Sequence, residues 1–242
     1  MPLPKPCELG SSANASRIRV ILKGAETKQS QLTPKMEKTE LLHIVTHENA
    51  DRYSSEMDQA FQLRHKVFVE EKGWTDLWRD DGREIDRFDN IDAVHMLYVE
   101  DGRVVGYQRM LPSTRPHLLT EVLSDLCEGE PPVAPNIWEW TRYCVEAGHR
   151  ERGRMLSPVA NALLSGIVEW GLARGIDTII IEMNPLWLLR LVQLHFRVTP
   201  LGVPRNIGGE ETVAVTASFD QRTLARLHEM RRASAKAGAG DG

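Results

Sequence analysis

The sequence predicts an α/β (α+β) fold in which a mixed β-sheet lies between two layers of helices. Residues 96–111, MLYVEDGRVVGYQRML, indicate two strands joined by the turn Asp101-Gly102, which is a strong signal for an antiparallel hairpin. Residues 137–183 then alternate strand, helix and an isoleucine-rich strand, which indicates a βαβ unit with a parallel strand pair. Antiparallel and parallel pairs in one sheet, with helices between the strands, predict a three-layer mixed sheet.

The remaining elements have local signals of their own. Asn184-Pro185 begins a helix that reaches Phe196, and Asp220 is an N-cap residue before a last amphipathic helix. In chain order, the predicted strands are residues 41–45, the two strands of 96–111, 137–145, 178–183 and 212–219. The predicted helices are residues 50–69, 157–174, 184–196 and 220–232.

Composition limits the class of protein. The chain has 242 residues, of which 41% are hydrophobic and 26% are charged, as expected for one sizeable globular domain. Its formal net charge of −4 disfavours a nucleic-acid partner, and no eighteen-residue apolar run predicts a membrane span. The three cysteines are far apart and lack the spacing of a disulfide framework or a metal site. We therefore expect a cytoplasmic protein that uses no metal.

The ends of the chain differ in composition from its middle. Residues 1–38 are rich in Pro, Ser, Lys and Gln, which predicts a flexible N-terminal extension. Residues 39–232 carry all the predicted elements and form the single folded domain, while residues 233–242 are small and predict a flexible tail. The sequence leaves open whether Met1 or Met36 is the native start.

Arg64 occupies an unexpected position. It follows Phe61 by three residues and precedes Phe68 by four, so it shares the apolar face of the predicted helix 50–69. A buried guanidinium is costly unless it meets an anion, and a bidentate carboxylate is its best partner. The acidic loop DGREIDRFDN, residues 81–90, offers three carboxylates within six residues.

Two further arginines are candidates for the same network. Arg109 shares one face of its predicted strand with Val105 and Tyr107. Glu139 and Arg142 lie three residues apart in IWEWTRY, so both can serve one site only if a β-bulge or a strong twist lies there. Taken singly, each feature also fits a structural ion pair or a solvated turn.

The order of these motifs is more specific than any one of them. The Arg-x3-Phe-x5-Trp block, the E-x-D-x-F-D loop, the G-x-x-R strand and the W-E-x-x-R strand resemble the acyl-homoserine-lactone synthases, the LuxI-type autoinducer synthases. The resemblance covers residues 39–145 in motif order and continues in layout to Phe219. It implies the N-acetyltransferase (GNAT) fold.

The resemblance also implies the reaction. Members of this family join an acyl thioester to S-adenosylmethionine (SAM), which is a substrate rather than a cofactor. The SAM amine attacks the thioester, and the methionyl carboxylate then closes a lactone and expels methylthioadenosine, giving a quorum-sensing signal. The residues implied in catalysis are Glu84, Asp86, Asp89, Arg109, Glu139 and Arg142. Those expected to bind SAM are Arg64, Phe68, Trp74 and Trp138. Either Glu139 or Glu84 would be the base that takes the ammonium proton.

The acyl donor has a weaker signal. Arg150 and Arg154 precede a predicted helix N-terminus, where they would suit a pantetheine phosphate or an acidic acyl carrier protein, so carrier protein and coenzyme A both stay open. We expect the acyl chain beside Trp140, Tyr143, Ile180 and Met183. IWEWTRY resembles the branch of the family that takes short branched or aryl CoA thioesters.

Two rival functions follow from the same residues. A GNAT-type N-acyltransferase that acts on another amine would need no SAM. A non-catalytic acyl-binding module would need neither the base nor the acidic loop.

From the sequence we expect Arg64→Ala to abolish product while the protein still folds, because the network binds SAM.

Overall fold

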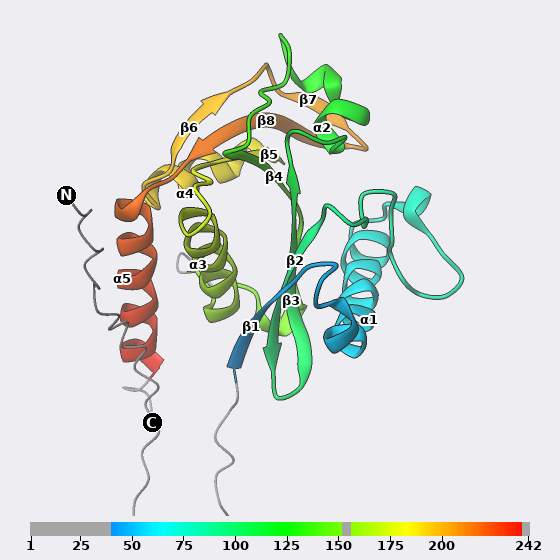
Figure 1. Ribbon diagram of the computed structural model, residues 1–242, viewed down its shortest axis with the longest axis vertical. Helices are drawn as coiled ribbons and strands as arrows, with labels where there is room; N and C mark the ends of the chain where they lie inside the picture. The colour runs from blue at the N-terminus through cyan, green and yellow to red at the C-terminus, as the bar shows by residue number, and fades with distance from the viewer. Residues whose placement is uncertain (1–39, 152–155, 239–242) are drawn as a thin grey trace, which may run out of the picture. The chain divides into compact units, whose positions relative to one another are not determined.

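The computed structural model describes residues 40–151 and 156–238 (Figure 1). In this part of the chain one sheet holds eight strands in the order β1-β2-β3-β4-β5-β8-β6, with β7 paired to β8. The strands are β1 Glu40–Val45, β2 Val94–Glu100, β3 Arg103–Pro112, β4 Ile137–Val145, β5 Thr178–Met183, β6 Arg197–Pro200, β7 Arg205–Ile207 and β8 Glu210–Ser218.

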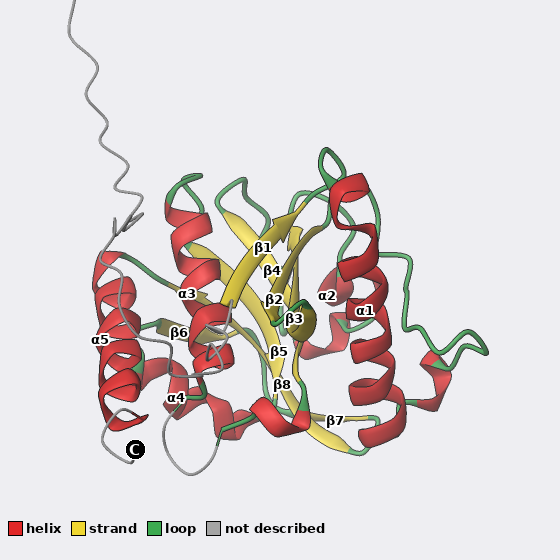
Figure 2. Cartoon of the chain, turned by 90° about the horizontal axis from the view of Figure 1, so that it is seen from below, coloured by secondary structure: helices red, strands yellow, loops and turns green. Residues whose placement is uncertain are grey.

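Helices cover both faces of this sheet. The helices are α1 Ser54–Arg64, α2 Leu118–Glu121, α3 Pro158–Leu172, α4 Leu188–Gln193 and α5 Gln221–Gly238. Figures 1 and 2 show α1 on one side of the strands, and α3 with α5 on the other. The predicted three-layer mixed sheet is therefore confirmed.

The strand pairs have the predicted directions. β2 and β3 form an antiparallel hairpin. At its turn Asp101 and Gly102 have φ values of 50° and 78°, the left-handed backbone that an Asp-Gly turn provides. β4 and β5 are parallel and are connected through α3, as predicted for the βαβ unit.

Several element boundaries differ from the sequence prediction. The first helix ends as an α-helix at Arg64 and continues as a π-helical segment, His65–Glu71. The strands β6 and β7 were not predicted, and α5 continues beyond its expected end at residue 232 to Gly238. The predicted extension, residues 1–38, and the last residues of the predicted tail, 239–242, lie outside the described residues.

The core is divided by the sheet. On the face covered by α3 and α5, henceforth the α3 face, the buried cluster includes Met96, Met110, Trp140, Leu164, Ile167, Ile179 and Ile181. On the face covered by α1, henceforth the α1 face, it includes Leu63, Val67, Phe68, Leu97, Val99 and Tyr107. Because strand side chains alternate, β2 and β3 each supply residues to both clusters.

Two irregularities shape the centre of the sheet. The register between β3 and β4 passes from Arg109↔Thr141 to Tyr107↔Cys144, so β4 has one extra residue there. The parallel pairing of β4 with β5 ends at Glu139↔Ile180, although both strands continue. The two central strands therefore part from one another just after Glu139, and we call this opening the β4–β5 gap. No helix in the described part of the chain is long and apolar enough to cross a bilayer.

Candidate active site

Arg64 is the centre of a buried ion-pair network on the α1 face. It is the last residue of α1, and its side chain is fully buried. Its Nη1 and Nη2 atoms donate to the two carboxylate oxygens of Asp89 at 2.7 and 2.9 Å, and its Nε donates to Glu84 Oε2 at 2.5 Å. The inward charge that the helical period predicts therefore meets two carboxylates of the predicted acidic loop.

Arg109 links the other acids of that loop. Its Nη1 donates to Asp86 Oδ1 and to Asp89 Oδ1, both at 2.7 Å, and its Nη2 donates to Asp86 Oδ2 at 3.0 Å. Its Nε donates to the hydroxyl of Thr141 on the neighbouring strand. Four hydrogen bonds from this fully buried guanidinium thus go to the loop or to β4.

Arg142 reaches the network through the β-bulge in β4. It has a φ of 55°, the left-handed region that is unfavourable for a residue with a side chain. Its Nε donates to Glu84 Oε2 at 3.1 Å, and its Nη2 donates to Asp86 Oδ2 at 2.8 Å. Of the two irregularities that the sequence left open, the structure has the bulge, and it turns Arg142 onto the α1 face.

Six side chains therefore form one closed network of three arginines and three carboxylates. Five of them are almost completely enclosed, while the Asp86 side chain is 14% exposed. Arg142, at 7%, is the most exposed of the arginines. Asp86 and Arg142 thus form the edge at which a ligand can approach, and they present opposite charges there.

The arginines control the ionisation of both aspartates. Burial alone would raise the pKa of Asp89, but the charges of Arg64 and Arg109 hold it well below its usual range. Burial likewise opposes ionisation of Asp86, but the hydrogen bond and charge of Arg109, helped by Arg142, lower its pKa. Both aspartates are therefore carboxylates at neutral pH.

Tyr107 and His95 complete the network on its inner side. The Tyr107 hydroxyl accepts a hydrogen bond from Arg64 Nη1 at 3.2 Å and lies 2.7 Å from His95 Nδ1. Burial lowers the pKa of His95 to about 4, so the ring is neutral at pH 7. Its Nδ1 can therefore accept a hydrogen bond from the Tyr107 hydroxyl. In the sequence, Tyr107 is evident only as a neighbour of Arg109, and His95 was not predicted because it has no local motif.

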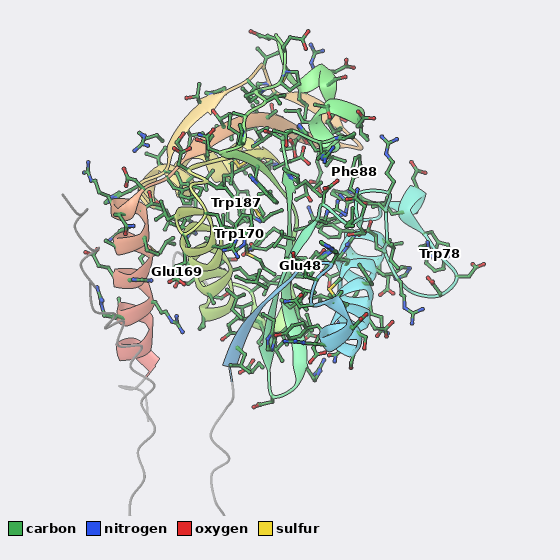
Figure 3. The ribbon with its side chains drawn as sticks, in the orientation of Figure 1. Glu48, Trp78, Phe88, Glu169, Trp170 and Trp187 are labelled. Atoms are coloured by element: carbon green, nitrogen blue, oxygen red, sulfur yellow. The ribbon has the colours of Figure 1, made fainter. Side chains whose placement is uncertain are left out.

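Aromatic rings lie beside the exposed edge. Phe68 and Trp74 are stacked with ring centroids 5.1 Å apart. The Arg142 guanidinium lies 5.7 Å from the Phe68 centroid, and the Arg109 guanidinium lies 5.9 Å from that of Phe88. Figure 3 shows Phe88 on the side of the sheet that carries α1. Of the expected SAM-binding residues, Phe68 therefore lies beside Arg142 at the exposed edge with Trp74 stacked on it, whereas Arg64 lies fully buried behind that edge.

Trp138 does not lie with this set. It packs against the α3-face cluster and makes an edge-to-face contact with Trp170 of α3, with centroids 4.9 Å apart. Alternation along β4 explains this placement, because Trp138 precedes Glu139 by one residue and so points to the opposite face. The expected contact of Trp138 with the SAM group of residues is absent from the described structure.

Glu139 lies on the α1 face but outside the network, so the network holds three of the four expected carboxylates. Its oxygens accept hydrogen bonds from the backbone N–H groups of Leu118 and Leu119 at 2.9 and 2.7 Å, where α2 begins. Oε1 also lies 2.8 Å from Nδ1 of His117. Glu139 is thus held by the segment His117–Leu119, for which no role was predicted from the sequence. It is also the last residue of β4 that pairs with β5 before the β4–β5 gap.

The residues expected at the acyl chain are divided between the two faces. Trp140 and Tyr143 contact one another edge to face at 5.3 Å, and Tyr143 lies 6.4 Å from Trp187, which the sequence analysis missed. Met183 packs with the same α3-face cluster. Ile180 instead faces α2 on the other side of the sheet. Figure 3 shows Trp170 and Trp187 on the α3 and α4 side.

The expected phosphate arginines are only partly described. Arg150 donates to the carbonyl of Val145 and to a carboxylate oxygen of Glu71, so part of its guanidinium already has partners. Arg154 lies outside the described residues.

Comparison with known proteins identifies relatives over most of the chain. A model of the autoinducer synthase family matches residues 48–227. The isovaleryl-homoserine lactone synthase of Bradyrhizobium diazoefficiens is 37% identical over 190 residues, which cover 78% of this chain and 84% of that protein. An acyl-homoserine-lactone synthase of Ralstonia nicotianae is 34% identical over 170 residues, covering 68% of this chain and 82% of that protein.

Solved structures give the same picture. The CoA-dependent acyl-homoserine lactone synthase BjaI, described with MTA in one structure and with SAM and isopentyl-CoA in another, has a TM-score of 0.74 and 36% identity. The match covers 79% of this chain and 89% of BjaI. The AHL synthase LasI has a TM-score of 0.69 at 27% identity, covering 80% of this chain and 96% of LasI.

Proposed function

Because this chain belongs to the autoinducer synthase family and is an acyl-homoserine-lactone synthase, we propose that SAM binds at the ion-pair network and the acyl donor at the β4–β5 gap. The reaction joins an acyl thioester to SAM by N-acylation, followed by lactonisation with release of methylthioadenosine. The network and the gap are neighbours along β4, since Arg142 and Glu139 lie on the same strand.

The observation that most directly supports the SAM site is the pair of opposite charges at the exposed edge. SAM has a carboxylate, an ammonium and a sulfonium at one end, so it needs both signs of charge and an aromatic surface. Arg142 suits the carboxylate, Asp86 suits a cationic group, and the stacked rings of Phe68 and Trp74 suit the sulfonium. The remaining members, Arg64, Glu84, Asp89 and Arg109, orient these two.

The contacts favour Glu139 over Glu84 as the base. Glu84 is fully buried, and both of its oxygens accept hydrogen bonds from arginines. Its oxygens are therefore already occupied by arginine N–H groups and are closed off from a ligand. Glu139 is held by two neutral backbone donors and by His117, and no arginine donates to it among the described residues. We assign to Glu139 the removal of the ammonium proton that precedes attack on the thioester carbonyl.

The acyl donor fits the α3 face of the sheet, opposite the face that carries the ion-pair network. Beyond Glu139 and Ile180, β4 and β5 no longer pair, so a pantetheine arm can occupy the gap and hydrogen-bond to strand backbone. Trp140, Tyr143 and Trp187 form an aromatic row on that side, which favours a compact acyl group over a long flexible one. Isovaleryl in the name of one relative and isopentyl-CoA in a structure of another agree with this inference. We propose a short branched acyl-CoA as the donor, bound with help from Arg150.

Domain organisation and location follow from this assignment. We propose that residues 39–232 form the catalytic unit and that residues 1–38 and 233–242 are not needed for turnover. SAM and acyl thioesters are both cytoplasmic metabolites, so the cytoplasm is the proposed location, and no nucleic-acid partner is required.

A direct assay tests the proposed substrates. The purified protein is incubated with SAM and a panel of acyl-CoA and acyl-carrier-protein thioesters, and products are identified by mass spectrometry. The proposal expects the highest kcat/KM with a short branched acyl-CoA. A preference for acyl carrier protein, or for a long straight chain, would contradict it. Acylation of another amine without SAM would instead support the GNAT-type rival.

A further inference from the structure

A second buried acid lies beside Glu139. Glu182 is on β5, two residues beyond Ile180, which is the register partner of Glu139. Because alternate strand residues share a face, Glu182 points to the same side of the sheet as Ile180 and Glu139. The negative charge of Glu139 acts on the Glu182 carboxyl. The two acids therefore face each other across the β4–β5 gap.

These two carboxyl groups cannot both be ionised at little cost. The residue Glu182 is half-buried, but its Oε1 atom is sealed from solvent and has no hydrogen-bond partner among the described protein groups. Two close carboxylates in such a site share one proton, because the second negative charge is repelled by the first. Burial, and then the negative charge of Glu139, raise the pKa of Glu182 well above its usual range.

The surrounding groups do not cancel this repulsion. The positive charge of Arg142 acts on Glu182, but Arg142 is bound directly to Glu84 and Asp86 in the network. Cys127 is the titratable neighbour from the segment after Leu126, and burial, followed by the charge of Glu182, raises the pKa of its thiol. Cys127 is therefore uncharged at neutral pH.

His117 completes the set from the α2 side. Its ring is fully buried, with Nδ1 at Glu139 and Nε2 without a partner among the described groups. The ring therefore fixes the position of the Glu139 carboxylate, and its other nitrogen makes no ion pair there.

We propose that Glu182 is a positioning residue that acts through Glu139: the two glutamates hold a single shared proton, and the charge of Glu182 makes Glu139 a strong enough base for the SAM ammonium. This inference rests on the proposed function. Enzymes commonly raise the basicity of a carboxylate in this way, by burial and a like charge, so that it can act near neutral pH.

The proton count of the acylation step balances with this pair. The ionised pair takes one proton from the ammonium nitrogen, and the nitrogen lone pair then forms the N–C bond at the thioester carbonyl. The C–S bond breaks with its electron pair going to sulfur, and the proton held by the pair passes to that sulfur. The second proton of the nitrogen goes to solvent, and the pair is again ionised.

The test is the pH dependence of thiol release with SAM and isovaleryl-CoA. In the wild type, kcat/KM for SAM should rise with pH through the titration of the pair. Glu182→Gln keeps the shape and hydrogen-bonding capacity of the side chain but removes its charge, so the rising limb should move to lower pH. The rate at neutral pH should fall by roughly a hundredfold, while KM for SAM changes little. A limb unchanged in Glu182→Gln would overturn the proposal.

Matched variants separate this effect from structural ones. Glu182→Asp keeps the charge and should retain the wild-type limb. His117→Gln cannot titrate and should also retain it; loss of the limb in His117→Gln alone would assign the titration to histidine and overturn the proposal. Glu169→Gln is the control, because Glu169 lies on α3 with a 52% exposed side chain paired to His228.

An infrared spectrum of the wild type keeps the test independent of variant folding. The proposal predicts the band of a buried protonated carboxyl group below the limb, which disappears above it. Absence of that band at every pH would overturn the proposal. A wild type that forms acyl-homoserine lactone without these signs refutes only the role of Glu182. A wild type that forms no methylthioadenosine at any pH refutes the proposed function itself.

Discussion

Arg109 Nη1 lies 2.7 Å from both Asp86 Oδ1 and Asp89 Oδ1, so one nitrogen bridges two carboxylates of the same loop. The two bridged aspartates differ in their surroundings, and the sequence alone cannot distinguish them. Asp89 is 2% exposed and is enclosed by Arg64 and Arg109, whereas Asp86 is at the exposed edge. We therefore propose that Asp89 serves mainly the fold and Asp86 mainly the ligand.

Asp89→Asn should lower the free energy of unfolding at pH 7 by about 3–5 kcal/mol, because two buried guanidinium groups each lose one of their two carboxylate partners and keep only Glu84 or Asp86. Urea denaturation measures this difference. The exposed acid Asp81, paired with Arg79 on the same loop, is the matched control, and Asp81→Asn should change stability little. Equal effects of the two variants would contradict the structural role of Asp89.

The contacts of Asp89 with Arg64 and Arg109 also predict that the stability of the fold depends on pH in the acid range. The folded protein holds the pKa of Asp89 below its usual value of about 3.9 in an unfolded chain. The stability that Asp89 contributes is therefore present above about pH 4 and is lost as the pH falls through the lower, folded value. Unfolding curves of the wild type and Asp89→Asn should converge at acid pH. A difference that stays constant on acidification would refute this account.

Asp86→Asn should weaken SAM use more than it weakens the fold. The variant loses the negative charge at the exposed edge but keeps oxygen and nitrogen atoms for its neighbours. We expect KM for SAM to rise about tenfold or more, since an ion pair to a ligand contributes more than 1.4 kcal/mol when partly desolvated. The melting temperature should fall less than it does in Asp89→Asn. A SAM KM equal to that of the wild type would contradict the proposed role.

Glu139→Gln should slow acylation by roughly a hundredfold while SAM binding falls much less, because the amide keeps the hydrogen bonds to α2 in part but cannot accept a proton. Single-turnover kinetics measure the step. Glu84→Gln is the comparison variant, and it should lose stability and SAM binding together. Should Glu139→Gln retain its single-turnover rate while Glu84→Gln loses it, the base would be Glu84.

Trp187→Ala should change acyl preference. Trp187 ends the aromatic row, and its residue is 38% exposed, so truncation lengthens the space available to an acyl chain. The ratio of kcat/KM for a longer acyl-CoA over isovaleryl-CoA should rise by about tenfold, the scale of one or two methylene groups. Trp78→Ala is the control, because Trp78 is exposed beside His65 instead. An unchanged ratio in Trp187→Ala would remove Trp187 from the acyl site.

Structural features could be predicted from the sequence where the signal for them was local. The helical period around Arg64 and the Asp101-Gly102 turn are short-range patterns, and both were interpreted correctly. The bulge at Arg142 followed from strand geometry alone. The contact of His117 with Glu139 joins segments twenty-two positions apart with no shared motif, so no pattern could predict it.

Other misses had a physical cause that the sequence did contain. Strand alternation places Trp138 on the face opposite Glu139, and Ile180 on the face opposite Met183. Strict use of that rule would have divided both residue sets. The expectation that Arg64→Ala leaves the fold intact is also revised, because removing Arg64 would leave Glu84 and Asp89 with fewer cations inside a closed network.

The central claim is that one face of the sheet holds SAM while the β4–β5 gap delivers a short acyl thioester to its amine. The most direct measurement follows isovaleryl-homoserine lactone and methylthioadenosine together, by mass spectrometry, when the purified protein receives SAM and isovaleryl-CoA. The account predicts both products in equal amounts, and roughly a hundredfold less of each with Glu139→Gln over the same time. Thioester consumption without methylthioadenosine, or methylthioadenosine without an acylated lactone, would contradict it.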